Sequence, residues 1–331
     1  MTPPRIGFLG AGLIATYHSK SLRRSGVDVV RAGVYDPDPE RLAAFATASG
    51  HVAMSSETEV LDSCDAVYVC TWTSEHPRLV AEAARRGLHV FCEKPLAFDA
   101  ASAAQMAAAV ETAGVAHQVG LVLRHSPVFL RARELVTDPA AGRVMTVVFR
   151  DDQFIPVQGH YASTWRGDRQ KAGAGTLLEH SIHDVDMLRF LVGEVASVNG
   201  HVSYHHGIEG IEDVTSVLLR FESGATGTLT SVWHDNLARP SLRRVEIFCE
   251  RRHVVVDGDD WFGPVSWTDT DGTTGEFDAS ELPYANPDGE FVNAITAGRP
   301  ASPGFAEAVA AHRIVDAIYR SARTGGATDT P

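Results

Sequence analysis

The sequence predicts two domains: an α/β domain on a doubly wound parallel sheet at residues 1–122, and an α+β domain with an open, mainly antiparallel sheet at residues 123–331. In the first third, short apolar runs alternate with segments long enough for helices, which is typical of a parallel sheet covered on both faces. After about residue 122, paired strand-like runs are joined by short glycine-containing turns, a hairpin pattern. A chain of 331 residues is also long for a single hydrophobic core.

The predicted elements follow in chain order. Strand-like runs of the first domain lie at residues 5–10, 29–36, 65–71, 88–94 and 115–123. The alanine-rich segment 99–114 has a strong helix former at most positions and a closing glycine, so it predicts one of the covering helices. Strands of the second domain are expected at 144–154, 216–233 and 243–258, and helices at 288–298 and 302–323. The tail, residues 324–331, is expected to be disordered.

The composition limits the partners of this chain. Lys and Arg number 29 against 42 Asp and Glu, and the resulting charge of −13 repels phosphate backbones and anionic membranes. Neither nucleic acid nor a membrane is therefore an expected partner. The four cysteines show no C-x-x-C spacing, and no segment has the pattern of an export signal or a membrane span. A cytoplasmic protein is expected.

A glycine-rich turn after the first strand predicts a phosphate-binding site. Gly10, Gly12 and Ala15 have G-x-G-x-x-A spacing. In this pattern the first glycine permits the tight turn, the second lets the backbone approach a pyrophosphate, and the small third residue keeps helix and strand close. Leu13 and Ile14, in the first turn of the helix, are expected beside the cofactor. Small residues also serve ordinary strand-to-helix turns, so the spacing needs support from its context.

Asp36 supplies part of that context. It ends the second strand-like run, 21 residues after Ala15, where a carboxylate can accept hydrogen bonds from an adenosine ribose and repels a 2′-phosphate. The prediction is therefore NAD, with NADP disfavoured. Asp36 can also cap the helix that follows it, and the two roles are compatible.

Two further strand ends point to the same crevice. Thr71, Trp72 and His76 follow the run at 65–71 and are predicted to line the nicotinamide side, with packing and helix capping as the alternative. Lys94 ends the run at 88–94, where a partly desolvated lysine near a positive nicotinamide ring can exchange a proton. Pro95 fixes the exit direction of the chain and admits a cis bond. The alternative is an ordinary surface lysine in a loop.

A second constellation lies in a glycine-rich entry followed by a predicted helix, residues 171–193. Glu179, His183 and Asp186 are spaced i, i+4 and i+7, so they share one face of a continuous helix. A histidine flanked by carboxylates has a fixed orientation and a stabilised imidazolium, which suits proton transfer from an alcohol as hydride leaves. A solvated helix face and a metal site including His180 are the alternatives, and no metal is predicted.

Four stretches together, "GAGLIA", the acid in "VYDPDPER", "HVFCEKPLA" and "GTLLEHSIHDVD", resemble the Gfo/Idh/MocA family, the relatives of glucose-fructose oxidoreductase and inositol dehydrogenase. The resemblance covers nearly the whole chain and implies an NAD-binding Rossmann domain at the N-terminus. It implies that Lys94 contacts the reacting hydroxyl, that Glu93 lies by the nicotinamide ribose, and that Lys94–Pro95 is cis. It also implies catalytic roles for Glu179 and His183.

At two positions expected to lie near the substrate, this sequence differs from the family pattern. The family commonly has Asp at the position of Glu179, and polyol-oxidising relatives often have two consecutive arginines where this chain has Leu123 and Arg124. Arg124 is a predicted substrate contact, and Asp186 is another. Trp165, shortly before the glycines, is expected to cover the substrate or to pack at the domain interface.

These observations predict a dehydrogenase acting on CH–OH groups, which transfers a hydride between a sugar, polyol or related hydroxylated small molecule and nicotinamide. His183 and Lys94 are expected to manage the hydroxyl proton, and which of them is the principal base is left open. Two alternatives remain: an NAD-using, redox-neutral glycoside-cleaving enzyme, and a non-catalytic regulator that senses NAD or sugar. By resemblance, the chain is expected to form a homodimer or homotetramer.

Overall fold

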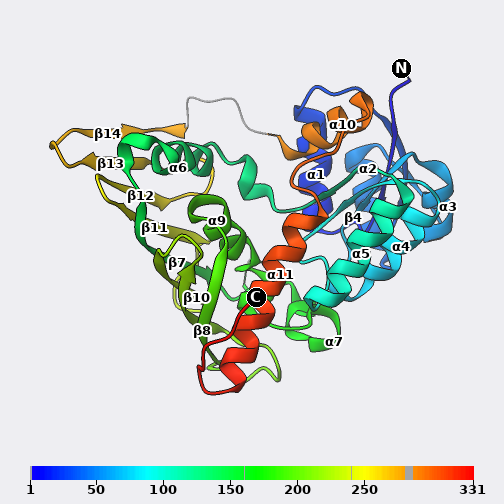
Figure 1. Cartoon of the computed structure of the whole chain (residues 1–331). Helices are drawn as coiled ribbons and strands as arrows, with labels where there is room; N and C mark the ends of the chain where they lie inside the picture. Colours follow the sequence, from blue (N-terminus) through cyan, green and yellow to red (C-terminus); the bar gives the residue numbers. More distant parts are fainter. Residues whose placement is uncertain (1, 160, 240, 280–285) are drawn as a thin grey trace. The chain divides into compact units, whose positions relative to one another are not determined.

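The computed structural model describes residues 2–159, 161–239, 241–279 and 286–331. The chain divides into two compact units (Figure 1). The first unit contains Met1–Leu121 and Asn286–Val309, and the second contains Val122–Ala285 and Ala310–Pro331. The predicted division near residue 122 differs from this in one respect, because residues 286–309 belong to the first unit.

The first unit is built on a six-stranded parallel sheet, as the sequence predicts. Its strands are β1 (Arg5–Leu9), β2 (Val30–Tyr35), β3 (Val52–Ala53), β4 (Ala66–Val69), β5 (His89–Cys92) and β6 (His117–Val119). The spatial order is β3-β2-β1-β4-β5-β6, so the winding direction reverses between β1 and β4. In such sheets, ligands bind outside the carboxyl ends of the strands at this reversal.

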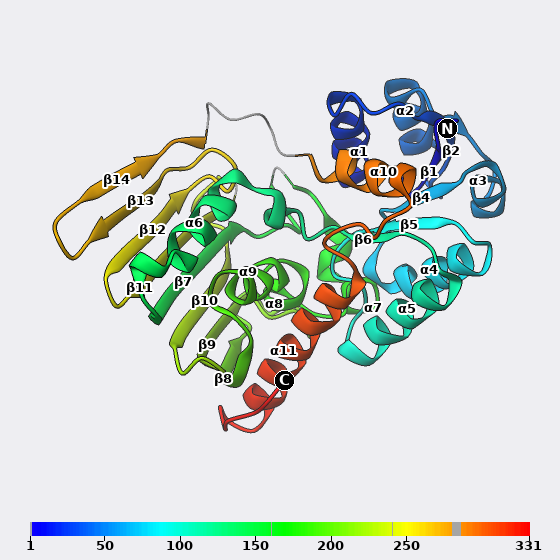
Figure 2. The ribbon, with the colours of Figure 1, turned by 45° about the horizontal axis from the view of Figure 1, so that its top comes forward.

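Helices cover both faces of this sheet (Figure 2). On one face lie α1 (Leu13–Arg24), α2 (Pro39–Ser49) and α10 (Pro287–Ala297). On the other lie α3 (Glu57–Ser63), α4 (His76–Arg85) and α5 (Ala100–Ala113). The short 3₁₀ helix η1 (Thr73–Glu75) precedes α4. The predicted alanine-rich helix is α5, and it ends as expected at Gly114, whose φ of 66° favours glycine.

An aromatic core explains why residues 286–309 return to the first unit. Phe8, Tyr68 and Phe91, from β1, β4 and β5, stack side by side with ring centroids 4.7 and 4.6 Å apart. Phe291 of α10 meets Tyr68 and Phe91 edge-on at 5.6 and 5.7 Å. Offset and edge-to-face arrangements of this kind stabilise a core beyond the area they bury. Phe305, at the start of α11 (Phe305–Arg323), is buried in the core on the opposite face.

The second unit is built on an eight-stranded sheet. Its strands are β7 (Val144–Phe154), β8 (Val195–Ser203), β9 (Val214–Phe221), β10 (Thr226–His234), β11 (Leu242–Cys249), β12 (Arg252–Gly258), β13 (Val265–Asp269) and β14 (Thr274–Phe277). The order is β14-β13-β12-β11-β7-β10-β9-β8, with every neighbouring pair antiparallel except β7 and β10. The predicted mainly antiparallel sheet is confirmed.

Helices cover one face of this sheet. They are η2 (Val122–His125), α6 (Pro127–Thr137), η3 (Pro139–Ala141), η4 (Thr164–Gly167), α7 (Arg169–Ala172), α8 (Thr176–Glu179), α9 (Ile182–Val192) and most of α11. Side chains alternate along the strands, so Val245 and Ile247 of β11 are buried with α6, α9 and α11 in one core. On the opposite face, Val148 of β7 and Leu218 of β9 are exposed.

The C-terminal tail is ordered, which corrects the expectation of disorder. Asp329 forms an antiparallel bridge with Val198 of β8, with backbone hydrogen bonds of 2.9 and 3.0 Å. Arg320 of α11 holds the Asp329 carboxylate at 2.8 Å. The expectation rested on small and polar residues, which do not reveal pairing with a distant strand. Within the described part of the chain, no helix has the length and apolar character needed to cross a membrane.

Candidate active site

The glycine turn after β1 has the geometry that a dinucleotide requires. Gly10 has φ of 90°, and a Cβ there would lie 2.5 Å from the carbonyl oxygen of Cys70, so only glycine fits. A Cβ on Gly12 would meet nothing within 4 Å, which leaves open space before the N-terminus of α1. That first turn carries no acidic side chain, and Ala15 is fully buried against the sheet. The N-terminus of α1 therefore suits a pyrophosphate.

Asp36, at the end of β2, is buried beside this turn. Its Oδ2 accepts a hydrogen bond from the backbone N–H of Ala11 at 2.8 Å, and its Oδ1 accepts one from Asp38 at 2.9 Å. The cap of α2 is Asp38, which accepts from the N–H groups of Glu40 and Arg41. The alternative role of Asp36 as a helix cap is therefore wrong, while its role in ribose binding stays a prediction.

Two apolar side chains project from the first turn of α1. Leu13 is 59% exposed and Ile14 is 39% exposed. Exposed aliphatic side chains at a phosphate-binding turn are well placed to contact a cofactor, because they lie where a dinucleotide would remove them from water.

The residues after β4 lie next to those after β5, because Val69 pairs with Cys92 in the sheet. Thr71 and Trp72 are partly exposed at this edge. His76 is buried, with Nδ1 2.9 Å from the carbonyl oxygen of Pro95 and Nε2 3.3 Å from that of Thr71. Burial lowers the pKa of His76, so it is neutral near pH 7. Its contacts hold the turn that contains Lys94.

That turn has the conformation that the resemblance implied. The Lys94–Pro95 peptide is cis, and Lys94 is partly exposed at the carboxyl end of β5. Glu93 is buried, and its Oε2 accepts a hydrogen bond from the Lys94 backbone N–H at 3.3 Å. A Cβ on Gly120 would lie 2.3 Å from Oε1 of Glu93, so glycine is needed at the end of β6 to make room for this carboxylate.

Glu93 is held by a buried histidine that sequence reasoning missed. Nε2 of His18 lies 2.8 Å from Oε1 of Glu93, and Nδ1 lies 2.7 Å from Oδ1 of Asp288 in α10. Burial alone would lower the pKa of His18, but Asp288 and Glu93 outweigh it and raise the pKa to about 10. His18 is therefore an imidazolium that joins two buried carboxylates behind the Lys94 turn.

The segment that contains Glu179, His183 and Asp186 has a different secondary structure from the one predicted. The segment forms two helices, α8 and α9, with a break at His180, whose φ of −123° and ψ of −61° are not helical. Glu179 ends α8, and His183 lies in the first turn of α9. The expected continuous helix is wrong, and the shared face inferred from it does not apply. All three predicted residues, Glu179, His183 and Asp186, are buried.

Two arginines hold the carboxylates of this segment. Arg124 binds Asp186 with two parallel hydrogen bonds, Nε to Oδ2 at 2.8 Å and Nη2 to Oδ1 at 2.7 Å. Arg166 lies with Nε 3.4 Å from Oε2 of Glu179. Its guanidinium also stacks 4.4 Å from the ring centroid of Trp165. Two predicted substrate contacts, Arg124 and Asp186, are thus paired with each other, while Arg166 was missed.

The glycines before α8 serve a structural purpose. A Cβ on Gly175 would lie 1.9 Å from the carbonyl oxygen of Glu212, so the backbones are in close contact there. The buried Glu212 carboxylate accepts hydrogen bonds from the N–H groups of Gly175 and Leu177, at 2.8 and 3.0 Å. Glu212 was also missed, because only the fold brings it to the start of α8.

Beneath α9, a buried cluster surrounds Arg243 of β11. Its Nε lies 2.5 Å from Oδ1 of Asp184, its Nη2 lies 3.7 Å from Oδ2 of Asp151, and it also pairs with Asp260. Nε2 of His180 lies 2.6 Å from Oδ2 of Asp151. The cluster therefore ties the residues that flank Glu179 and His183 to the sheet. Among the described residues, no group of three or more His, Cys, Asp or Glu side chains could hold a metal ion.

The doubly wound sheet and the glycine turn with Asp36 are typical of a dinucleotide-binding domain. Comparison with known proteins agrees: residues 4–121 match the oxidoreductase family with an NAD-binding Rossmann fold, GFO_IDH_MocA, and residues 129–255 match the GFO/IDH/MocA C-terminal domain. The chain belongs to the Gfo/Idh/MocA family, as the sequence motifs predicted, and it is an NAD-dependent oxidoreductase.

Relatives and a solved structure extend this result. Inositol 2-dehydrogenase of Rhizobium meliloti (strain 1021) is 30% identical over 336 residues, 96% of each chain. The 1,5-anhydro-D-fructose reductase of Ensifer adhaerens is 32% identical over 228 residues, 66% of each chain. A levoglucosan dehydrogenase in complex with NADH superposes with a TM-score of 0.89 at 23% identity, covering all of both chains. At that identity the likeness shows a shared fold.

Proposed function

We propose that this protein oxidises a hydroxyl group of a sugar, an inositol or a related polyol with NAD, or reduces the corresponding carbonyl compound with NADH. The observation that carries the proposal is the position of Lys94 beside the buried Glu93, directly after the carboxyl end of β5, at the ligand-binding edge of the parallel sheet. The names of the two relatives, an inositol dehydrogenase and an anhydrofructose reductase, support this substrate class.

In the proposed mechanism, the residues of the first unit hold the cofactor and the lysine. The glycine turn takes the pyrophosphate, Asp36 takes the adenosine ribose, and Leu13, Ile14, Thr71 and Trp72 surround the rest. When bound, the nicotinamide takes up or returns the hydride. Lys94 then donates a hydrogen bond to the reacting oxygen, while Glu93 binds the nicotinamide ribose. His76 acts by holding Pro95 in place, at 2.9 Å.

The second unit supplies the proton acceptor and the substrate contacts. We assign His183 as the base that removes the hydroxyl proton, with Glu179 beside it. The longer side chain of Glu179, where relatives commonly have Asp, is matched here by Arg166 at 3.4 Å. Asp186 is buried and fixes the guanidinium of Arg124, so Arg124 is the member of that pair that binds substrate hydroxyls. Trp165 then covers the substrate.

Substitution of Lys94 tests the proposal. Lys94→Ala is expected to lower kcat by about 10²-fold or more, the usual range for loss of an acid–base group, and to leave the Kd for NADH within about threefold. Substrates are found first by following NADH formation across sugars, inositols, sugar acids and aromatic diols. Lys20→Ala, at an exposed lysine of α1, is the matched control and should have wild-type kinetics. Unchanged turnover in Lys94→Ala would refute the assignment.

The same assay separates the alternatives. Net formation of NADH requires a dehydrogenase, whereas glycoside cleavage without net NADH formation would identify the redox-neutral reaction. Absence of any turnover, with ligand binding retained, would identify a sensor.

We also propose that the protein is a cytoplasmic homodimer or homotetramer. Its four cysteines, Cys64, Cys70, Cys92 and Cys249, are buried free thiols, which fits a reducing compartment. The exposed apolar residues Val148 and Leu218 on the uncovered sheet face support association of two copies.

A further inference from the structure

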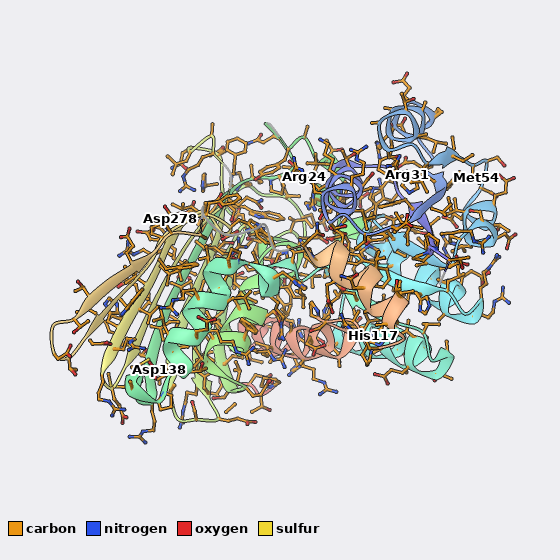
Figure 3. The ribbon with its side chains drawn as sticks, turned by 90° about the horizontal axis from the view of Figure 1, so that it is seen from above. Arg24, Arg31, Met54, His117, Asp138 and Asp278 are labelled. Atoms are coloured by element: carbon orange, nitrogen blue, oxygen red, sulfur yellow. The ribbon has the colours of Figure 1, made fainter. Side chains whose placement is uncertain are left out.

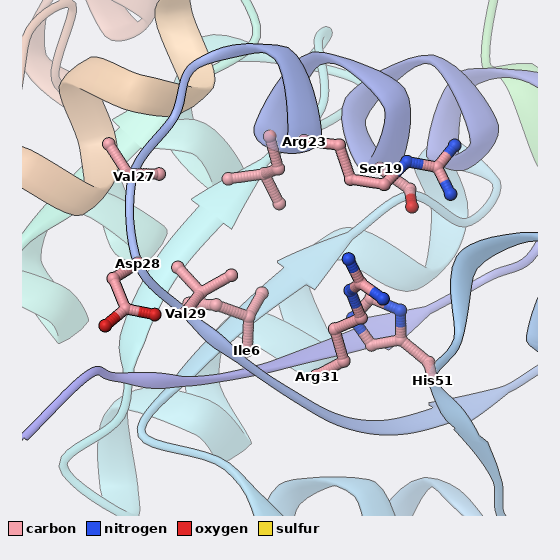
Figure 4. Close-up of a pocket in the computed structure, with 9 residues that line it drawn as sticks. Ile6, Ser19, Arg23, Val27, Asp28, Val29, Arg31 and His51 are labelled. Atoms are coloured by element: carbon pink, nitrogen blue, oxygen red, sulfur yellow. The ribbon is translucent and has the colours of Figure 1, made fainter.

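A cavity of about 460 Å³ lies in the first unit, away from the glycine turn (Figure 4). Its lining is Ile6, Ser19, Leu22, Arg23, Val27, Asp28, Val29, Arg31 and His51. Ile6 and Arg31 are the second residues of β1 and β2, at the amino-terminal edge of the sheet, whereas the glycine turn follows the carboxyl end of β1. The cavity is therefore separate from the cofactor site.

Two arginines, Arg23 and Arg31, line this cavity. Arg23 projects from α1, and one of its N–H groups binds the carbonyl oxygen of Ala48 at 2.7 Å. Arg31 lies beside His51 in Figure 4. Within the described residues, neither guanidinium forms an ion pair, whereas Arg5 and Arg41 of the same unit each pair with aspartate. Unpaired guanidinium groups around a cavity are the donors that bind phosphate oxygens.

The pKa of the buried His51 indicates that the electrostatic potential in the cavity is positive. Its Nδ1 lies 3.0 Å from Oγ of Ser49. Burial, together with the charges of Arg31 and Arg23, lowers the pKa of His51 to about 4. Among the described residues that line the cavity, Asp28 is the one acid, and it lies across the view from Arg31 and His51 in Figure 4. A positive cavity in a chain with a net charge of −13 is a local exception that favours an anion.

We propose that this cavity, which we call the arginine pocket, binds a phosphate group, either free or carried by a small molecule. Arg23 and Arg31 clamp the phosphate oxygens, and the hydroxyl of Ser19 faces the same space. The apolar residues Ile6, Leu22, Val27 and Val29 offer a surface for an organic part. A volume of about 460 Å³ falls in the range of small-molecule sites.

The test uses protein saturated with NADH, so that the cofactor's own phosphate site is filled. Inorganic phosphate and glycerol 3-phosphate are titrated at constant ionic strength, while the thermal midpoint and the His51 ring nitrogens are followed by scanning fluorimetry and NMR. The wild type is expected to show a saturable rise in midpoint and a rise of about 1–3 units in the pKa of His51, because the bound anion offsets the arginines.

Three variants decide the outcome. Arg23→Gln/Arg31→Gln and the single variant Arg31→Gln should lose the saturable response. Arg24→Gln is the matched control: Arg24, labelled in Figure 3, follows Arg23 in α1 but is not part of the lining, so its variant should respond like wild type. A stronger response to glycerol 3-phosphate identifies a phosphorylated small molecule, and equal responses identify free phosphate. Absence of saturation in the wild type, or an equal response in the double variant, would overturn the proposal.

Discussion

At the residue scale, the position of Glu93 depends on the charge of His18. Both carboxylates that contact His18 are buried, and a buried carboxylate without a counter-charge is strongly destabilising. One imidazolium between Glu93 and Asp288 satisfies both, and it also joins α1 and α10 to the turn that bears Lys94. The charge on this histidine is thus part of the structure of the candidate active site.

This charge predicts a loss of stability at alkaline pH. The pKa of His18 is raised to about 10 in the folded protein, from 6.5, so its contribution is complete below about pH 6.5 and is lost as the pH rises through 10. His18→Gln removes the charge at every pH. The difference in unfolding free energy between wild type and His18→Gln should therefore be large at pH 7 and should shrink towards pH 10, as measured by denaturant titration.

His117→Gln is the control for this experiment. His117 also lies in the first unit, but burial lowers its pKa, so it is neutral throughout that pH range. Its substitution should give a difference that does not change between pH 7 and pH 10. A difference for His18→Gln that is equally constant would show that His18 is neutral and that the ion pairs are absent.

The sequence predicted Glu93 and Lys94 as site residues but not His18 or Asp288. The motif around Lys94 is local, so its position at a strand end follows from the pattern of apolar runs. The contact between His18 and Asp288 joins residues 270 positions apart, and nothing in either local segment signals the other. An isolated histidine in a helix is compatible with many roles, and only the fold selects one.

At the element scale, the break between α8 and α9 follows from competing contacts. Spacing alone predicted one helix, because no proline or glycine interrupts the segment from Thr176 to Val192. The side chain of His180 contacts Asp151 in β7, and that of Asp184 contacts Arg243 in β11. These tertiary contacts accompany the break at His180, and helical propensity is a weaker influence than such contacts. The alternative of a solvated helix face is excluded by the burial of Glu179, His183 and Asp186.

Loss of Arg243 should destabilise the second unit. Burial alone would lower its pKa, but Asp151 and Asp184 raise it, so the guanidinium stays charged. Arg243→Met would leave the fully buried Asp184 without its arginine partner, while Asp151 keeps its contact with His180, and removal of one partner from a buried ion pair costs about 3–5 kcal/mol. Denaturant unfolding should show a decrease of that size, and Arg243→Met/Asp184→Asn should recover part of it.

The neighbouring Arg244 provides the comparison. It also forms ion pairs, with Glu246 and Asp257, but its side chain is exposed, and such pairs contribute little because water screens them. Arg244→Met is therefore expected to unfold at nearly the same denaturant concentration as wild type. If both variants lose equal stability, the buried cluster has no special role.

At the scale of the whole molecule, the sequence predicted the two architectures but not the path of the chain between them. The change from helix-separated runs to hairpins predicts a boundary near residue 122, and the first compact unit leaves the chain at Leu121 before it resumes at Asn286. No sequence pattern indicates that residues 286–309 belong to the first unit. A helix such as α10 has a similar apolar pattern whichever sheet it covers. Its destination is decided by Phe291 against Tyr68 and Phe91, and by Asp288 against His18.

The face of the eight-stranded sheet opposite the helices carries exposed apolar side chains. Register places Val148 of β7 opposite Thr228 of β10, and Thr228 opposite Leu218 of β9, so the three lie in one row. Val148 is 45% exposed and Leu218 is 51% exposed. Apolar side chains in a row on a sheet favour a self-complementary interface, in which a second copy covers the same patch.

Charged substitutions in this row test the proposed association of two copies. Val148→Arg and Leu218→Arg would each place a guanidinium in the buried centre of the proposed interface. In Val148→Arg the new arginine can pair with Glu246, its neighbour on β11, so this variant is expected to keep the fold. Light scattering should give the mass of an oligomer for wild type and of a monomer for both variants. Val52→Arg, at a 56% exposed valine of β3, is the control and should remain oligomeric, because that strand belongs to the other sheet. A wild-type protein that is monomeric at all concentrations, or variants that keep the wild-type mass, would show that two copies do not associate through this face.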